Sequence, residues 1–122
     1  MIKIFVLASG RSGTKFLSGL FKNNIRSCKS KHEPFPNMFG IPIYWYQKRE
    51  NEKIRGRFLI KKNRIDKCRK AIYIETNHAF LKSFSDIAME YYPDMKLIHL
   101  IRDPLKVARS ELNRESWIND VP

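Results

Sequence analysis

A glycine-containing segment near the start of the chain combines the groups that bind phosphate. Residues 8–17 read Ala-Ser-Gly-Arg-Ser-Gly-Thr-Lys-Phe-Leu, directly after the apolar run Ile2–Leu7 and at the start of a segment with helical apolar spacing. A buried strand, a glycine turn and a helix N-terminus present unpaired N–H groups and a positive helix dipole to an anion. The sequence therefore predicts a phosphate-binding loop made of Gly10, Arg11, Ser12, Gly13, Thr14, Lys15 and Phe16.

This loop differs from the loop of nucleotide triphosphatases. The triphosphatase motif has a longer spacing between its glycines and ends in Gly-Lys followed by Ser or Thr. Here Gly10 lies three residues before Gly13, Thr14 precedes Lys15, and Phe16 stands where the magnesium-binding hydroxyl is expected. Backbone binding of phosphate is compatible with the change, so we expect an anion site that requires no metal.

A second segment near the other end of the chain also has the features of an anion site. Residues 97–101 are apolar except for one histidine, as in a strand covered on both faces. Asp103 can cap a following helix, and Pro104 suits its first turn. We therefore expect Arg102 at the end of a strand and Ser110 about two turns into the next helix, where both can reach one anion.

Together the two segments resemble the family of sulfotransferases that use 3′-phosphoadenosine-5′-phosphosulfate, in particular its carbohydrate branch. Residues 11–14 resemble the family's 5′-phosphosulfate loop. Residues 100–104, with Ser110, resemble its 3′-phosphate-binding segment, in which Arg102 and Ser110 would hold the phosphate. Glu33-Pro34 resembles the position of the acceptor-activating carboxylate in the carbohydrate branch.

The resemblance implies a fold and a reaction. We expect a three-layer P-loop-like α/β fold, with a central parallel sheet flanked by helices, in one domain over residues 1–122. The family's domain is about twice as long, so we expect either a fragment that is incomplete at the C-terminus or a minimal form that needs a partner. The donor would be 3′-phosphoadenosine-5′-phosphosulfate, and the acceptor a hydroxyl group, with a carbohydrate as the favoured class.

The pattern along the chain supports this fold independently. Expected strands alternate with expected helices, which indicates a parallel sheet with right-handed crossovers. Between the two anion segments the expected elements are a helix over 14–23, a short strand over 24–27, a loop over 33–42, a helical aromatic cluster over 43–46, a strand over 71–76, and a helix capped by Ser83 or Ser85 that ends before Pro93.

Candidate acid–base residues follow the expected strands. Ligands of parallel sheets bind at the carboxyl ends of the strands, so we expect the glycine loop, Glu33, Asn77-His78 and Arg102 to converge on one cleft. In the implied reaction Glu33 takes the proton of the acceptor hydroxyl, with His32 and His78 as competing bases. Lys15 and Arg11 would stabilise the charge on the departing phosphate. A surface or structural role stays open for each of the three bases.

The charge of the chain indicates anionic partners. The sequence has 24 basic and 12 acidic residues, a formal net charge of +12. Residues 53–70 contain nine Lys or Arg and one acid, Asp66, with Ile54, Phe58, Ile65 and Cys68 at helical spacing. We expect an amphipathic helix that starts near Asn51 and has a basic outer face. This face is either ordinary solvated surface or a site for an acidic glycan or a nucleic acid.

Two alternative functions remain open at this stage. A small P-loop metabolite kinase explains the strand, loop and helix but predicts the missing Gly-Lys-Ser/Thr. A non-catalytic nucleic-acid-binding module explains the charge but leaves the glycine loop unexplained. Cys28 and Cys68 lack metal-ligand spacing, and we expect two free thiols. No apolar run is long enough for a targeting core or a membrane span, so we expect a cytoplasmic protein.

Overall fold

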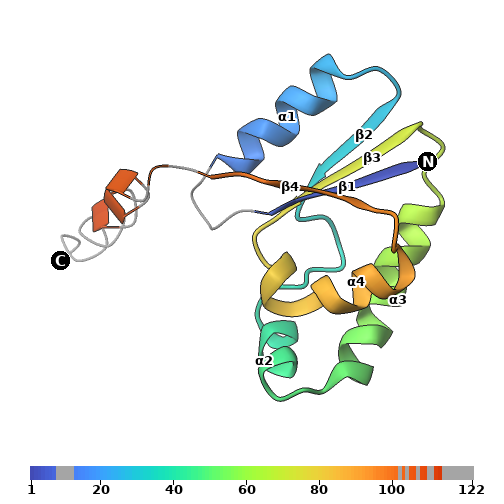
Figure 1. Cartoon of the computed structure of the whole chain (residues 1–122), viewed down its shortest axis with the longest axis vertical. Helices are drawn as coiled ribbons and strands as arrows, with labels where there is room; N and C mark the ends of the chain where they lie inside the picture. Colours follow the sequence, from blue (N-terminus) through green and yellow to red (C-terminus); the bar gives the residue numbers. More distant parts are fainter. Residues whose placement is uncertain (8–12, 102, 104, 107, 110–111, 114–122) are drawn as a thin grey trace.

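The computed structural model describes residues 1–7, 13–101, 103, 105–106, 108–109 and 112–113. Its helices and strands follow one another in the order β1 (Ile2–Leu7), α1 (Thr14–Asn24), β2 (Cys28–His32), α2 (Ile41–Gln47), α3 (Asn51–Asp66), β3 (Ile72–Asn77), the π-helical turn η1 (Phe80–Phe84), α4 (Ser85–Tyr91) and β4 (Lys96–His99) (Figure 1).

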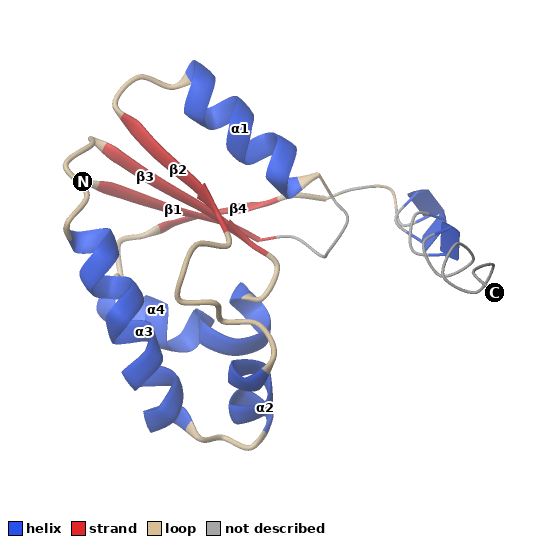
Figure 2. Ribbon diagram, turned by 180° about the vertical axis from the view of Figure 1, so that it is seen from behind, coloured by secondary structure: helices blue, strands red, loops and turns tan. Residues whose placement is uncertain are grey.

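The strands form a parallel sheet in the order β2-β3-β1-β4. Helix α1 lies on one face of this sheet, and α2, α3 and α4 lie on the other (Figures 1 and 2). Leu7 is in register with Asn77 and His99, and His32 with Thr76, so the carboxyl ends of all these strands share one edge. The predicted α/β class and parallel sheet are confirmed.

Aromatic side chains dominate the core between the sheet and helices α3 and α4. Phe5 of β1 is fully buried, and its ring centroid lies 5.0 Å from that of Phe80, which is itself 5.0 Å from Phe84. Because side chains alternate along a strand, Val6 and Ile74 are buried on the opposite face, toward α1. The apolar residues from Ile4 to Leu7 therefore reflect burial on both faces of β1.

Helix α3 begins at Asn51, as predicted, and turns Ile54, Phe58 and Ile65 into the core. Lys61 lies on the same face and is only 1% exposed. Its Nζ is 3.0 Å from an oxygen of Glu75, which is fully buried in β3. The prediction of a basic face turned wholly outward is therefore wrong for Lys61, because the buried carboxylate requires a cationic partner.

The predicted strand over residues 24–27 is wrong. Helix α1 continues to Asn24, and the strand starts only at Cys28. Strand β2 reads Cys-Lys-Ser-Lys-His and lies at the edge of the sheet, so it has no apolar alternation. Its inward residue is Ser30, whose hydroxyl donates to the Ser18 carbonyl of α1 at 2.9 Å. A buried hydroxyl pair takes the place of an apolar contact here.

The predicted cap at Ser83 or Ser85 is also wrong. The helical segment already begins at Phe80, and the Ser83 hydroxyl donates to the Ala79 carbonyl at 3.0 Å, within the π-helical turn. The aromatic cluster over 43–46 is helical as predicted, within α2.

The C-terminal strand lies where it was predicted, but all four of its residues are exposed, so the prediction of a strand covered on both faces is wrong; β4 is an edge strand of the sheet. Strand β4 spans Lys96–His99, and the Leu100 N–H extends its ladder to the Leu7 carbonyl at 2.8 Å. Asp103 accepts a hydrogen bond from the Leu105 N–H at 2.9 Å, which confirms the predicted cap. Residues 105–106, 108–109 and 112–113 are helical. Cys28 and Cys68 are free thiols. Within the described part of the chain, every helix is too short or too polar to cross a membrane.

Candidate functional site

The N-terminus of α1 has the chemistry of an anion site. Gly13 precedes the helix with φ 85°, a left-handed conformation that glycine adopts without steric cost. The first turn of α1 contains no acidic residue, so its N–H groups and the helix dipole are not neutralised locally. Of the predicted loop residues described here, Thr14 is buried, Lys15 is exposed, and Phe16 is 72% exposed. Gly10, Arg11 and Ser12 lie outside the described residues.

Glu33 is held in an unusual backbone conformation directly after β2. Its N–H donates to the Thr76 carbonyl at 2.9 Å, which extends the β2–β3 ladder by one residue. Its φ of 46° lies in the left-handed region, which costs a residue with a Cβ about 1–2 kcal/mol. The carboxylate contacts Nδ1 of His78 and accepts from the His78 N–H at 3.4 Å. Glu33 therefore reaches from the end of β2 to the end of β3.

His32 lies beside this pair on the side of the sheet that carries α1. Its Nδ1 is 2.9 Å from the Thr76 hydroxyl, and its Nε2 is 3.9 Å from the second carboxylate oxygen of Glu33. Partial burial lowers the pKa of His32, and the positive charge of Lys15 lowers it further. Lys15 at the start of α1 therefore acts electrostatically on His32, and the imidazole is neutral at pH 7.

His78 completes a cluster of three titratable side chains. Partial burial lowers its pKa, and the charges of Lys82 and His32 lower it further. The Phe39 ring packs on it with a centroid distance of 4.9 Å. The side chains of His32, Glu33 and His78 are 29%, 27% and 21% exposed, so a ligand can reach all three.

A buried polar network supports the residues next to this cluster. Lys61 Nζ donates to the Pro34 carbonyl at 3.1 Å as well as to both carboxylate oxygens of Glu75. Asn77 donates to Glu75 at 2.9 Å and accepts from the Ala79 N–H at 2.9 Å. The network thus fixes Pro34, which follows Glu33, and Asn77, which precedes His78. Its one signal in the sequence is a carboxylate inside the otherwise apolar start of β3.

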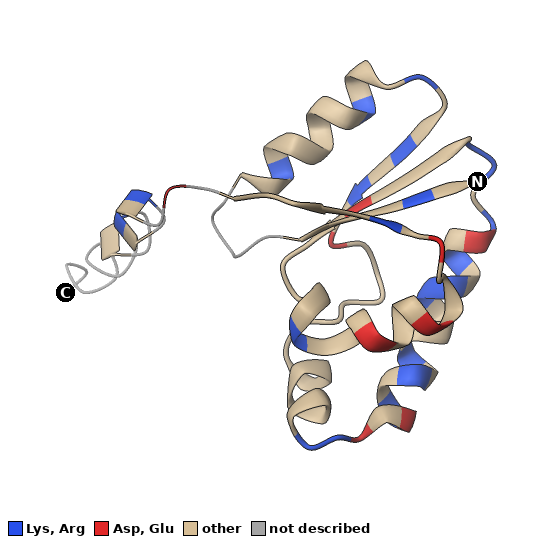
Figure 3. Cartoon of the chain, in the orientation of Figure 1, with Lys and Arg blue, Asp and Glu red and all other residues tan. Residues whose placement is uncertain are grey.

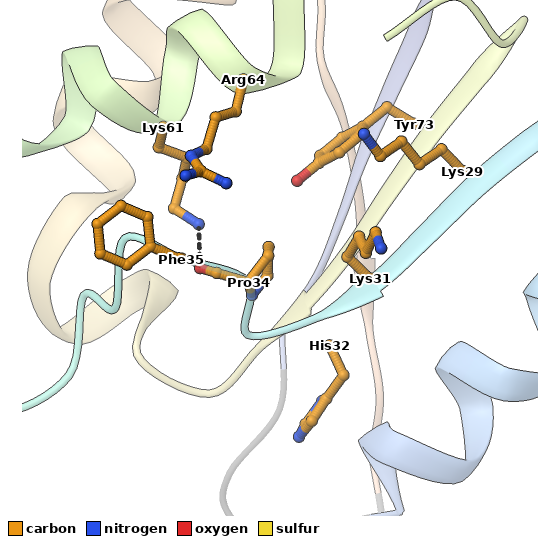
Figure 4. A pocket seen from close by; sticks show the side chains of 8 residues that line it. All are labelled: Lys29, Lys31, His32, Pro34, Phe35, Lys61, Arg64 and Tyr73. Atoms are coloured by element: carbon orange, nitrogen blue, oxygen red, sulfur yellow. Dashed lines mark hydrogen bonds between the residues drawn. The ribbon is translucent and has the colours of Figure 1, made fainter.

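A cavity of about 360 Å³ adjoins the cluster on the α3 side of β2 (Figure 4). Residues of β2 and α3 face each other across it, and His32 at its rim extends away from it (Figure 4). The residues that line it are Lys29, Lys31, His32, Pro34, Phe35, Lys61, Arg64 and Tyr73.

The structure brings together four of the predicted site residues. Glu33, His32 and His78 are in mutual proximity, and Lys15 acts on His32, all at the carboxyl edge of the sheet. The predicted 3′-phosphate ligands Arg102 and Ser110 lie outside the described residues. Over the described ranges, no group of three or more His, Cys, Asp or Glu side chains is arranged to hold a metal ion. Comparisons with protein-family models, with curated proteins and with solved structures return no match.

Proposed function

We propose that this chain is a P-loop-like sulfotransferase that moves the sulfuryl group of 3′-phosphoadenosine-5′-phosphosulfate to a hydroxyl acceptor, in the first instance a carbohydrate. The observation that supports this most is the position of Glu33. It lies at the same sheet edge as the N-terminus of α1, in contact with one histidine and beside another. An anion-binding helix end and a proton acceptor at one edge are what group transfer from a phosphosulfate requires.

The reaction assigns a role to each group. The acceptor oxygen attacks sulfur, its proton passes to the Glu33 carboxylate, and the bond between sulfur and the bridging oxygen breaks. Adenosine 3′,5′-bisphosphate leaves with the bonding electrons on its 5′-phosphate. The N–H groups at the start of α1 and the ammonium group of Lys15 stabilise that developing charge.

The histidines act on this carboxylate rather than replacing it. His78 contacts one oxygen of Glu33 through Nδ1, and the His78 N–H donates to the same oxygen. These contacts orient the carboxylate and favour its ionised form. His32 is neutral beside it, so it adds no positive charge that would compete for the carboxylate.

Donor binding tests the proposal before any acceptor is known. Calorimetric titration of the chain with adenosine 3′,5′-bisphosphate, without metal, should show binding at least tenfold tighter than that of ADP. This expectation reflects the additional charge-assisted contacts to the 3′-phosphate. Arg102→Ala should remove the difference between the two nucleotides, while Arg26→Ala, which changes the same charge in the turn before β2, should preserve it.

Two outcomes would contradict the proposal. Equal affinity for both nucleotides, with a requirement for magnesium, would favour the metabolite kinase instead. Failure of both nucleotides to bind, combined with salt-sensitive binding of an oligonucleotide, would favour the nucleic-acid module.

A further inference from the structure

Cations gather on the α3-facing side of the edge strand β2, away from the N-terminus of α1. Lys29 and Lys31 of β2 and Arg64 of α3 line the same cavity, and Figure 4 shows the Arg64 guanidinium and the Lys29 ammonium directed into it. The guanidinium lies 4.7 Å from the centroid of the Phe35 ring, which fixes one wall. Figure 3 shows Lys and Arg positions along α3 and along the edge strand β2.

The described residues balance only part of the charge in this cavity. Lys61 is the only one of its four cations paired with a carboxylate among the described residues, at 3.0 Å from Glu75. No described Asp or Glu lies within 4.0 Å of the charged ends of Lys29, Lys31 and Arg64. Like charges in one pocket repel: burial lowers the pKa of Lys61 most, Glu75 opposes this, and the charges of Arg57 and Arg64 lower it further. An anion in the cavity would relieve this repulsion.

The cavity has the size of a ligand site. Its volume of about 360 Å³ falls within the range of roughly 300–1,000 Å³ typical of small-molecule pockets. Lys29 and Lys31 also line a second cavity of about 480 Å³, together with Lys67, Arg69 and Lys70. The basic lining therefore continues along β2, with room for more than an isolated small anion.

We propose that this cavity binds an oxyanion, a carboxylate or a sulfate or phosphate ester, carried by the acceptor molecule. Lys29, Lys31 and Arg64 supply the charge, and the Tyr73 side of β3 forms the floor. The cavity shares His32 and Pro34 with the surroundings of Glu33, so an anionic group bound there places a hydroxyl of the same molecule near the carboxylate. The assignment to the acceptor rests on the proposed function; the anion site itself does not.

The test uses inorganic sulfate on the full, isotope-labelled chain at constant ionic strength. Nuclear magnetic resonance separates the sites, because the Thr14 and Lys15 amides report on α1, whereas the Lys31 and Tyr73 amides and the Arg64 Nε–H report on the cavity. Sulfate should shift the cavity signals with a single dissociation constant. Acetate serves as the second probe, and whichever of the two anions binds more tightly is the preferred one.

Matched variants decide whether the cavity is responsible. Lys29→Ala/Lys31→Ala should weaken sulfate binding about tenfold or more, as expected for loss of charge-assisted contacts. The control Lys48→Ala/Lys96→Ala removes the same two charges from exposed positions, one directly after α2 and one on β4, and should stay within twofold of the parent. Arg64→Gln, on the exposed surface of α3, provides a second variant that keeps the core intact.

Unshifted cavity signals with both anions would overturn the proposal, as would an equal loss of affinity in the cavity and control variants. The oxyanion site and the proposed sulfotransferase function can fail independently, and the experiment distinguishes the two cases. Sulfate binding in the cavity without any binding of adenosine 3′,5′-bisphosphate would retain the oxyanion site and remove the sulfotransferase. Binding of adenosine 3′,5′-bisphosphate without a shift of the cavity signals would retain the sulfotransferase and remove the oxyanion site.

Discussion

Replacing Lys61 by Met should destabilise the fold strongly, because it leaves a buried carboxylate without its cation. Lys61 is 1% and Glu75 0% exposed, and Nζ lies 3.0 and 3.1 Å from the two carboxylate oxygens. Removing one partner of such a pair costs about 3–5 kcal/mol. The Tyr73 hydroxyl, at 2.7 Å, and the Asn77 amide, at 2.9 Å, still donate to Glu75. These donors place the expected loss near the lower end of that range, at about 3 kcal/mol.

Urea unfolding followed by circular dichroism measures this loss. With a slope of about 1.5 kcal/mol per molar urea, the midpoint of Lys61→Met should fall by about 2 M. The control is Lys62→Met, one residue further along α3. Lys62 is 30% exposed and pairs with Asp66 at 2.7 Å, so its loss should cost only about 0.5 kcal/mol.

A second substitution tests whether the unpaired Glu75 carboxylate causes the loss of stability. Glu75→Gln added to Lys61→Met removes the stranded charge. Its amide oxygen can still accept from Asn77, and its NH2 can donate to the Tyr73 hydroxyl oxygen, so the double variant should recover more than half of the lost stability. A Lys61→Met chain within about 1 kcal/mol of the parent would refute the buried pair, because that is the range of exposed ion pairs. A double variant no more stable than Lys61→Met would refute the stranded charge as the cause.

Four further predictions concern the site and the turn between α2 and α3. Lys15→Ala should raise the pKa of His32 measured by nuclear magnetic resonance, since the Lys15 charge lowers it, while the control Lys22→Ala should leave that pKa in place. Because the folded-state pKa of His32 is lowered, the folded chain binds fewer protons than the unfolded chain, so stability should fall as the pH drops below 6.5 in urea titrations. Arg49→Gly should raise the free energy of unfolding by up to about 1 kcal/mol, because Arg49 has φ 58°; a lower melting temperature would contradict this. Glu33→Gln should keep bisphosphate affinity within threefold but slow sulfuryl transfer from labelled donor to a glycan mixture by about 10²-fold or more, and an unchanged rate would exclude it as the base.

The parts of the fold that could be predicted from sequence have strong local signals. The run Ile2–Leu7 is apolar except for Lys3, because β1 lies between two other strands and buries Phe5 and Val6 on opposite faces. Gly13 marks a left-handed position immediately before a helix. Asp103 caps the segment that follows β4, as its side chain predicts. In each case the residues that determine the structure are neighbours in the chain.

The parts that could not be predicted depend on partners distant in the sequence. Strand β2 was misplaced because its inward residue, Ser30, is satisfied by Ser18 of α1 rather than by apolar packing. The burial of Lys61 depends on Glu75 in another element, which helical spacing alone does not show. The contact between Glu33 and His78 spans 45 residues, so the sequence could name both as candidates without pairing them.

If the anion-binding end of α1 and the Glu33 cluster form one site, a bound phosphate must change the pKa of His32, so this pKa is to be measured with and without adenosine 3′,5′-bisphosphate. Phosphate bound beside Lys15 offsets the charge that lowers this pKa, so binding should raise it, as followed by the ring signals across a pH titration. Binding with an unchanged pKa of His32 would contradict a single site, because the phosphate would then lie away from the cluster.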